Sequence, residues 1–339
     1  MIDGLFDVDS RLERLTKNGD ILLELNDLVP WEEFRSDLEV IYDHERKSNA
    51  GRRPFDVVMM FKIMILQALY NLSDDEMEYQ IIDRLSFTRF LGMNLGSRVP
   101  DAKTIWLFRS KLEKYELTRK LFDKFNAILA KAGYTAKSGQ IVDATIVKVP
   151  VQRNSHDENK AIKEGNPPVE NWSEAKKRQK DTDARWTQKN GKNFFGYKNH
   201  VEADVGCKII RDYKVTDASV HDSNVFEEIL DENNNSRDVY ADSAYRSAKS
   251  EANLKELNFC PHLQRKGYKG HPLTPLEKEG NRERARIRAR IEHIFGAMKQ
   301  RAGDVTVRTI GIKRAEVNLG LRNIAYNMER FCILMRQTA

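Results

Sequence analysis

Cysteine is scarce in this chain, and the three cysteines are far apart. Cys207, Cys260 and Cys332 are odd in number and show neither a disulfide framework nor the close spacing of a zinc site. Their scarcity argues against a small secreted domain held together by disulfides and indicates a reducing compartment.

Long apolar runs and targeting signals are also lacking. The most apolar stretch, 57–70, contains Lys62 and Gln67 and is too short to cross a bilayer, so it predicts a buried helix. The first residues, MIDGLFDVDSRLERL, have no basic segment followed by an apolar core, which argues against a signal peptide. No internal repeat or low-complexity tract is present. We therefore expect a cytoplasmic protein with no membrane partner.

Charge of one sign is only slightly in excess. Lys and Arg number 57 against 51 Asp and Glu, which leaves a net charge of +6 over 339 residues. An excess of this size permits an anionic partner without requiring one, so the location of the charge matters more than its sum. The length predicts about two domains with a sizeable core.

The first part of the chain has the patterning of helices. We expect helices at 56–70, 73–84, 101–113 and 117–132. Ser73 and Glu76 fit a capping box, and Gly133 fits a helix stop. The helices 73–84 and 101–113 suit either a helix-turn-helix variant or a plain helical bundle. We predict a helical, DNA-binding domain over 1–137, with its core at 51–133.

The pattern changes near Gln140, where the β-branched segment IVDATIVKV predicts a strand. A polar, basic insertion spans 150–192, and Asn190-Gly191 within it predicts a turn. Further strands are expected at 194–204, 207–218, 237–245 and 259–264, and helices at 220–230, 247–257, 275–301 and 315–336. This order predicts an α/β catalytic domain over 138–339 with a mixed, RNase H-like sheet flanked by helices.

Three acidic residues in this second part stand in contexts that hold a carboxylate in place. Asp143 interrupts an apolar strand, Asp242 ends another, and Glu292 lies in an arginine-rich helix. Each has a simpler interpretation: an edge-strand residue, a turn residue, and a partner for Arg288 four positions earlier. Asp143 is the most informative, because an aspartate inside an apolar strand is costly unless it is paired or bound to a metal.

Together the three carboxylates match the requirements of phosphodiester cleavage. Two divalent cations about 4 Å apart can activate the attacking oxygen and neutralise the developing charge. Mg²⁺ prefers oxygen ligands and is usually held by one or two carboxylates, water and phosphate. We therefore predict that Asp143, Asp242 and Glu292 bind two Mg²⁺ ions, with Mn²⁺ as a substitute.

Basic and aromatic residues supply candidate DNA contacts. Arg288 and Lys299 share a helical face with Glu292, where they could grip a DNA backbone. Other arginines of this helix alternate along the chain, so only some of them can face DNA; a solvated helix is the alternative. The remaining candidates are Arg185, Trp186 and Lys189 in the insertion and Arg109 and Lys111 on the helix 101–113. Trp186 suits stacking on an unpaired base or a small satellite core equally well.

A histidine near the third strand has two candidate roles. His221 precedes Asp222 at the start of the expected helix 220–230, and it could approach the metal site. A capping or core role is the expected one.

Several ordered blocks of the sequence resemble an insertion-sequence transposase of the IS-five family, which has a DDE catalytic domain. The helical blocks GRRPFDVVMMFKIMILQALYNLSDDEMEYQIIDRLSFTRFLG and PDAKTIWLFRSKL resemble the N-terminal domain of that family. VDATIV and ADSAYRS are similar to the first two catalytic blocks. The third block resembles Y-x2-R-x3-E-x6-K, with Arg288, Glu292 and Lys299 in register and Ala285 where the family has tyrosine.

The resemblance implies an RNase H-like fold with Asp143, Asp242 and Glu292 as metal ligands. It also implies that the protein binds terminal inverted repeats, cleaves them with water to free a 3′-OH, and joins that end to target DNA. It further implies a homo-oligomer, at least a dimer on paired ends, in a bacterial cytoplasm near the nucleoid. The alternatives are a nuclease that cuts structured DNA without joining and a catalytically silent, transposase-derived DNA-binding regulator.

Overall fold

The computed structural model describes residues 7–43, 53–152, 154–167 and 169–338. The chain forms two compact units, one made of Met1–Ile128 with Gly320–Ala339 and the other of Leu129–Leu319. The domain boundary predicted at 137/138 remains a prediction. It differs from the division into these units, which falls at 128/129 and groups the last part of the C-terminal helix with the first unit.

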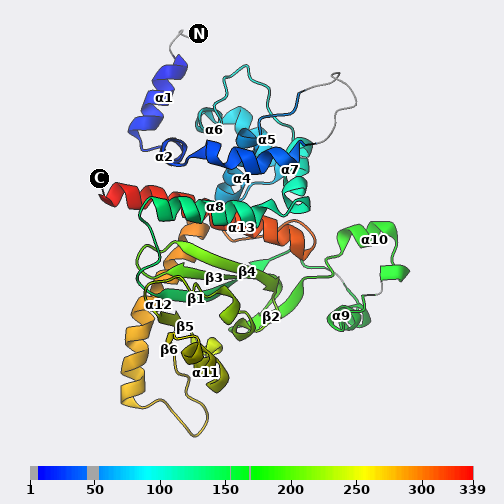
Figure 1. Cartoon of the computed structure of the whole chain (residues 1–339). Coiled ribbons are helices and arrows are strands. Elements are labelled where there is room, and N and C mark those ends of the chain that lie inside the picture. The colour runs from blue at the N-terminus through cyan, green and yellow to red at the C-terminus, as the bar shows by residue number, and fades with distance from the viewer. Residues whose placement is uncertain (1–6, 44–52, 153, 168, 339) are drawn as a thin grey trace. The chain divides into compact units, whose positions relative to one another are not determined.

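The first unit is helical, as expected (Figure 1). Its elements are α1 (Asp7–Lys17), α2 (Ile21–Leu28), η1 (Trp31–Phe34), α3 (Arg35–Leu38), η2 (Glu39–Ile41), α4 (Val57–Tyr70), α5 (Asp74–Asp83), α6 (Leu85–Phe90), α7 (Ala102–Lys114) and α8 (Leu117–Lys131), together with the end of α13 (Ile312–Thr338). Ten residues of α4 are buried, and α4 contacts α3, α5 and α7. The apolar stretch therefore forms the centre of this unit.

Local capping explains where these helices begin. The Asp56 carboxylate accepts the backbone N–H groups of Val58 and Met59 at the start of α4. The predicted capping box at α5 is confirmed, because the Ser73 hydroxyl accepts the N–H of Glu76 and the Glu76 carboxylate accepts the N–H of Ser73. Each contact satisfies a backbone donor that has no partner within the helix.

Within the described ranges, no single helix is long and apolar enough to span a membrane. Only α4 and α5 taken together reach the required length and composition, and a bend of 104° separates them.

The second unit contains a six-stranded mixed sheet. Its strands are β1 (Gln140–Lys148), β2 (Arg185–Lys189), β3 (Lys192–Asp204), β4 (Ile210–Asp217), β5 (Asp238–Ala241) and β6 (Cys260–Leu263). β3 pairs antiparallel with β1, β2 and β4, whereas β5 runs parallel to β1 and to β6. The predicted turn at Asn190-Gly191 connects β2 to β3, with both residues at positive φ. This is the mixed, helix-flanked sheet of an RNase H-like fold, as predicted.

Helices and apolar side chains cover the sheet. The helical elements of this unit are α9 (His156–Lys163), η3 (Val169–Asn171), α10 (Glu174–Gln179), η4 (Asp222–Asn224), η5 (Glu227–Ile229), η6 (Ser243–Tyr245), α11 (Ala248–Glu256), α12 (Pro275–Ala302) and the start of α13. α12 packs against β1 and β5 (Figure 1). A buried apolar cluster includes Val142 of β1, residues of β5, and Phe226 and Tyr245 from the connecting turns. Because neighbouring strand residues point to opposite faces, Asp143 points away from the face of Val142.

One predicted element is wrong. The segment 220–230 forms two short 3₁₀ turns, η4 and η5, in place of a continuous helix. Its start is rich in residues whose side chains bond to nearby backbone, namely Asp222, Ser223 and Asn224, and such residues compete with helix formation. The short turns still bury Phe226 and Ile229 against the sheet.

Candidate active site

The two aspartates of the sheet come together through strand pairing. β1 and β5 pair in parallel with Gln140 opposite Val239 and Ile141 opposite Tyr240. Continuing this register by two residues aligns Asp143 with Asp242. The negative charge of Asp242 raises the pKa of the Asp143 carboxyl, as expected for two carboxyl groups close enough to repel each other.

Asp143 is a carboxyl group largely removed from water. Its pKa is raised to about 6, mainly by burial and also by the Asp242 charge, while the Ala144 N–H and the positive charges of Arg288 and Lys189 oppose the shift. The Ala144 N–H donates to Asp143 Oδ1 at 2.8 Å. Burial disfavours the ionised form of this carboxyl group, and a cation bound beside it would favour that form.

Asp242 closes β5 and begins a tight turn. Its Oδ1 accepts the Ala244 N–H at 2.7 Å, which makes Asp242 the cap of η6. Asp242 is therefore a turn residue, as the simpler interpretation of the sequence had it. This turn also brings Tyr245 to the carboxyl end of the strand, where its ring is fully buried against Phe226 with the centroids 4.9 Å apart.

Arg288 connects the third carboxylate to the second. Its guanidinium lies 3.8 Å from Asp242 Oδ2 through Nη1 and 3.3 Å from Glu292 Oε1 through Nη2. The Arg288 side chain is 20% exposed and that of Glu292 is 65% exposed. The pairing of Glu292 with Arg288 was the simpler interpretation of the sequence, and the structure contains it. Glu292 thus meets the aspartates through an arginine, and its own carboxylate stays largely in solvent.

The carboxylate oxygens of Asp143, Asp242 and Glu292 are suitable ligands for a hard divalent cation, but the three groups do not converge on one point. Among the residues that the structure describes, no group of three or more His, Cys, Asp or Glu side chains is placed to hold a metal ion. Oxygen donors from Asp143 and Asp242 are the type that Mg²⁺ prefers. Glu292 can join them only after its carboxylate leaves Arg288.

The predicted DNA contacts of the second unit differ in their surroundings. Lys299 and Lys189 are exposed. Trp186 is 46% exposed, and its ring lies 5.2 Å from that of Phe195, so it is partly packed and partly available. Arg185 is half-buried and donates from Nη1 to the carbonyls of Thr182 and Ala184. The role of these residues in DNA binding remains a prediction.

In the first unit, Arg109 and Lys111 are engaged in internal contacts. Arg109 donates to both carboxylate oxygens of Asp74 at 2.8 and 2.6 Å, and Lys111 donates to the Ile41 carbonyl at 3.0 Å. Lys111 also lies over the Tyr42 ring, and burial lowers its pKa. DNA contact by either residue stays a prediction, and it would require these internal contacts to break.

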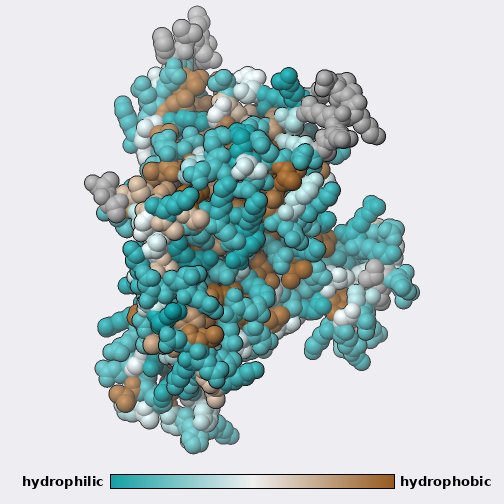
Figure 2. Space-filling view, in the orientation of Figure 1, coloured by the Kyte–Doolittle hydropathy of each residue, from teal (hydrophilic) through white to brown (hydrophobic). Residues whose placement is uncertain are grey.

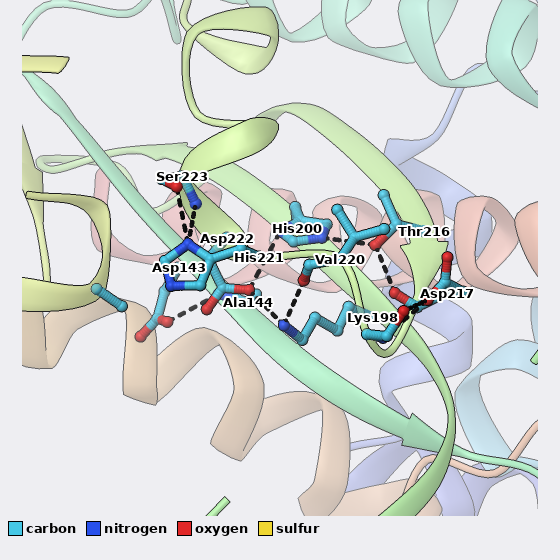
Figure 3. Close-up of polar contacts among 12 residues, drawn as sticks. Asp143, Ala144, Lys198, His200, Thr216, Asp217, Val220, His221, Asp222 and Ser223 are labelled. Atoms are coloured by element: carbon cyan, nitrogen blue, oxygen red, sulfur yellow. Dashed lines mark hydrogen bonds and ion pairs between the residues drawn. The ribbon is translucent and has the colours of Figure 1, made fainter. Parts of the chain in front are cut away.

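A polar network beside the strands was not assigned a role from the sequence. Lys198 Nζ donates to the Val220 carbonyl at 2.7 Å and to Asp222 Oδ1 at 2.8 Å (Figure 3). His221 caps η4, because its ring nitrogen accepts the Ser223 N–H, so the expected capping role is confirmed. The only sequence signal for this network was the pair of polar residues that follows the third expected strand.

An RNase H-like sheet with one aspartate in β1, another directly after β5 and a glutamate on the helix packed against these strands is typical of metal-dependent enzymes that cleave or join nucleic-acid strands. A comparison with family models agrees. A model described as Transposase DDE domain matches residues 134–328, and one described as Transposase domain (DUF772) matches residues 10–111. The chain belongs to the transposase DDE-domain family. No solved structure matches it at a significant level.

The family assignment confirms the resemblance to an insertion-sequence transposase. The protein is a DNA transposase, a metal-dependent enzyme that binds DNA, cleaves it and transfers the cut strand. The metal of such enzymes is a divalent cation.

Proposed function

We propose that this transposase binds the terminal inverted repeats of its own insertion sequence. It cleaves the phosphodiester bonds at the element ends with two Mg²⁺ ions and joins the freed 3′-OH ends to target DNA. It works as a homo-oligomer, at least a dimer, on paired ends. The alignment of Asp143 with Asp242 across two parallel strands, beside Arg288 of α12, is the observation that carries this proposal.

Each residue of the site has a distinct task in this proposal. Asp143, Asp242 and Glu292 hold the cations, which when bound activate water and neutralise charge at the scissile phosphate. With the two carboxylates committed to cations, Arg288, which now contacts both, would be free to bind a DNA phosphate as a bidentate donor. Lys299, seven residues after Glu292, adds a second phosphate contact on the same helical face.

A basic hollow in the same unit supports a longer DNA path. A cavity of about 600 Å³ lies beyond the end of β1. The cationic residues in its lining are Lys176, Arg178, Lys180 and Arg308. The surface of the segment with α9 and α10 is predominantly hydrophilic on the face shown in Figure 2. These cations, of which Lys176 is paired with Glu158, suit contact with a phosphate backbone, because such contacts release counterions from DNA.

The test uses the full chain with DNA carrying the candidate element ends and Mg²⁺, and it maps breaks on both strands. We expect Asp143→Asn, Asp242→Asn and Glu292→Gln each to abolish cleavage while end binding survives. Glu283→Gln, an exposed position on the same helix, is the matched control and should cut normally. Full cleavage by any one of the three variants would remove that residue from the mechanism.

A second assay separates transposition from simple cleavage. Precut ends with a free 3′-OH are incubated with a plasmid, and joined products are sequenced. Joining is expected for the transposase, whereas a structure-specific nuclease would cut without joining and a silent regulator would do neither.

A further inference from the structure

The buried hydroxyl of Tyr245 has no hydrogen-bond partner among the described residues. The side chain is fully buried, and the ring packs in the apolar cluster with Phe226. A phenylalanine would fill this space equally well, and an unpaired buried hydroxyl costs about 1–3 kcal/mol. An unsatisfied group of this kind in a native fold calls for an explanation such as a catalytic role or a bound ion or water.

Three acidic side chains act electrostatically on this hydroxyl. Burial is the main cause that raises the pKa of Tyr245 well above its ordinary value, and the charges of Asp143, Asp222 and Asp242 act in the same direction. Arg288 also acts on it, in the opposite direction. Tyr245 is therefore a neutral hydroxyl in the turn that Asp242 caps, and it lies within electrostatic reach of Asp143, Asp242 and one further acid, Asp222.

That further acid, Asp222, is held firmly in place. η4, which begins at Asp222, contacts η6, which ends at Tyr245. Lys198 donates to Asp222 Oδ1 at 2.8 Å, with side chains only 12% and 22% exposed (Figure 3). His200 lies 4.0 Å from the same oxygen, but burial lowers its pKa to about 4, so it is neutral at pH 7. Lys198 is thus a cation in direct contact with this carboxylate.

We propose that Tyr245 and Asp222 belong to the cation site of Asp143 and Asp242, Tyr245 as a positioning residue and Asp222 as a fourth carboxylate. A neutral phenol can donate to a carboxylate and accept from water, so the hydroxyl would gain the partners it lacks at a site that held a hydrated divalent cation. Asp222 adds negative charge to the site from outside the two aligned strands. This inference rests on the proposed function, which supplies the cation.

The test measures Mn²⁺ binding to the full chain without DNA, by calorimetry and by electron paramagnetic resonance. We expect Tyr245→Phe to weaken Mn²⁺ binding about five- to tenfold, as for the loss of one hydrogen bond. Its melting temperature without metal should be unchanged or higher, because an unpaired hydroxyl has been removed. Tyr240→Phe, the same change on the preceding strand, is the matched control and should bind Mn²⁺ like the parent.

Asp222→Asn should weaken Mn²⁺ binding about tenfold, as for a lost charged partner. Glu228→Gln, an exposed acid in the same connection, is its control. If Asp222→Asn fails to fold because Lys198 is left unpaired, the double variant Lys198→Gln with Asp222→Asn removes both charges and takes its place.

The outcomes separate this inference from the proposed function. If Asp143→Asn loses Mn²⁺ binding while the Tyr245 and Asp222 variants bind like the parent, the inference is overturned and the proposed site stands. A lower melting temperature for metal-free Tyr245→Phe would make the hydroxyl structural and also overturn its assignment. If the parent and Asp143→Asn bind Mn²⁺ equally, the proposed cation site itself is wrong.

Discussion

Replacing Arg288 with alanine should make the DNA-free protein bind divalent cations more tightly. The guanidinium lies 3.3 Å from Glu292 and 3.8 Å from Asp242, so a cation that recruits both carboxylates must first displace it. The Glu292 side chain is 65% exposed, and solvent screens such a pair to about 0.2–1 kcal/mol. The Asp242 contact is more buried but longer, and we assign it a similar value of about 1 kcal/mol.

Removing both contacts therefore favours the metal-bound state by about 1–2 kcal/mol. At 1.4 kcal/mol for each tenfold change, this corresponds to a gain in affinity of about five- to thirtyfold. Arg288 also lowers the pKa of Asp143, so its loss shifts that carboxyl toward the protonated form. The measurement should accordingly be made at pH 8, where Asp143 remains ionised.

The assay is calorimetric titration of Mn²⁺ into the parent, Arg288→Ala and Arg286→Ala. Arg286 is exposed on the same helix and provides the matched loss of charge. The binding of element ends by Arg288→Ala should weaken while its metal affinity rises, a combination that a damaged fold would not give. Metal affinity equal to or below that of Arg286→Ala would refute the reasoning.

Two other predictions concern charge. Asp143→Asn should stabilise the metal-free protein increasingly as pH rises from about 4 to 6, because the native pKa of about 6 lies above the ordinary 3.8 and ionisation of the buried carboxyl opposes folding. The plateau is about 3 kcal/mol at 1.36 kcal/mol per pKa unit, measurable by urea unfolding, and a pH-independent difference would contradict it. Lys299→Ala should weaken DNA binding uniformly across sequences and reduce the slope of log affinity against log salt by about one, measured by fluorescence anisotropy; an unchanged slope would remove Lys299 from the DNA contacts.

Most secondary elements were predictable because their signals are local. The capping box at Ser73, the apolar run of α4 and the β-branched run of β1 each depend on neighbours within a few residues. The failure at 220–230 has a local cause as well, since apolar spacing suggested a helix while Asp222 and its polar neighbours favoured tight turns. The strand β2 was hidden in a polar insertion because its stability comes from pairing with β3.

The site was predictable only in part. The sequence singled out Asp143, Asp242 and Glu292 by context and resemblance, and their use as metal ligands remains a proposal. Strand register decides which aspartates align, and that information lies in pairing between segments about 100 residues apart. Tyr245 and Asp222, which we propose as further site residues, were not singled out in the sequence, because an aromatic near a strand end usually belongs to the core and an aspartate at a turn usually caps it.

The charge balance of the site connects these findings. With Asp222 included as proposed, the site has four carboxylates, those of Asp143, Asp222, Asp242 and Glu292, and the cations that contact them among the described residues are Arg288 and Lys198. At pH 7 this leaves about two negative charges, because Asp143 with a pKa of about 6 is mostly ionised. Uncompensated negative charge beside a buried carboxyl is unfavourable for the fold alone. One divalent cation would neutralise it, so the same excess that weakens the metal-free protein favours the metal that its chemistry requires.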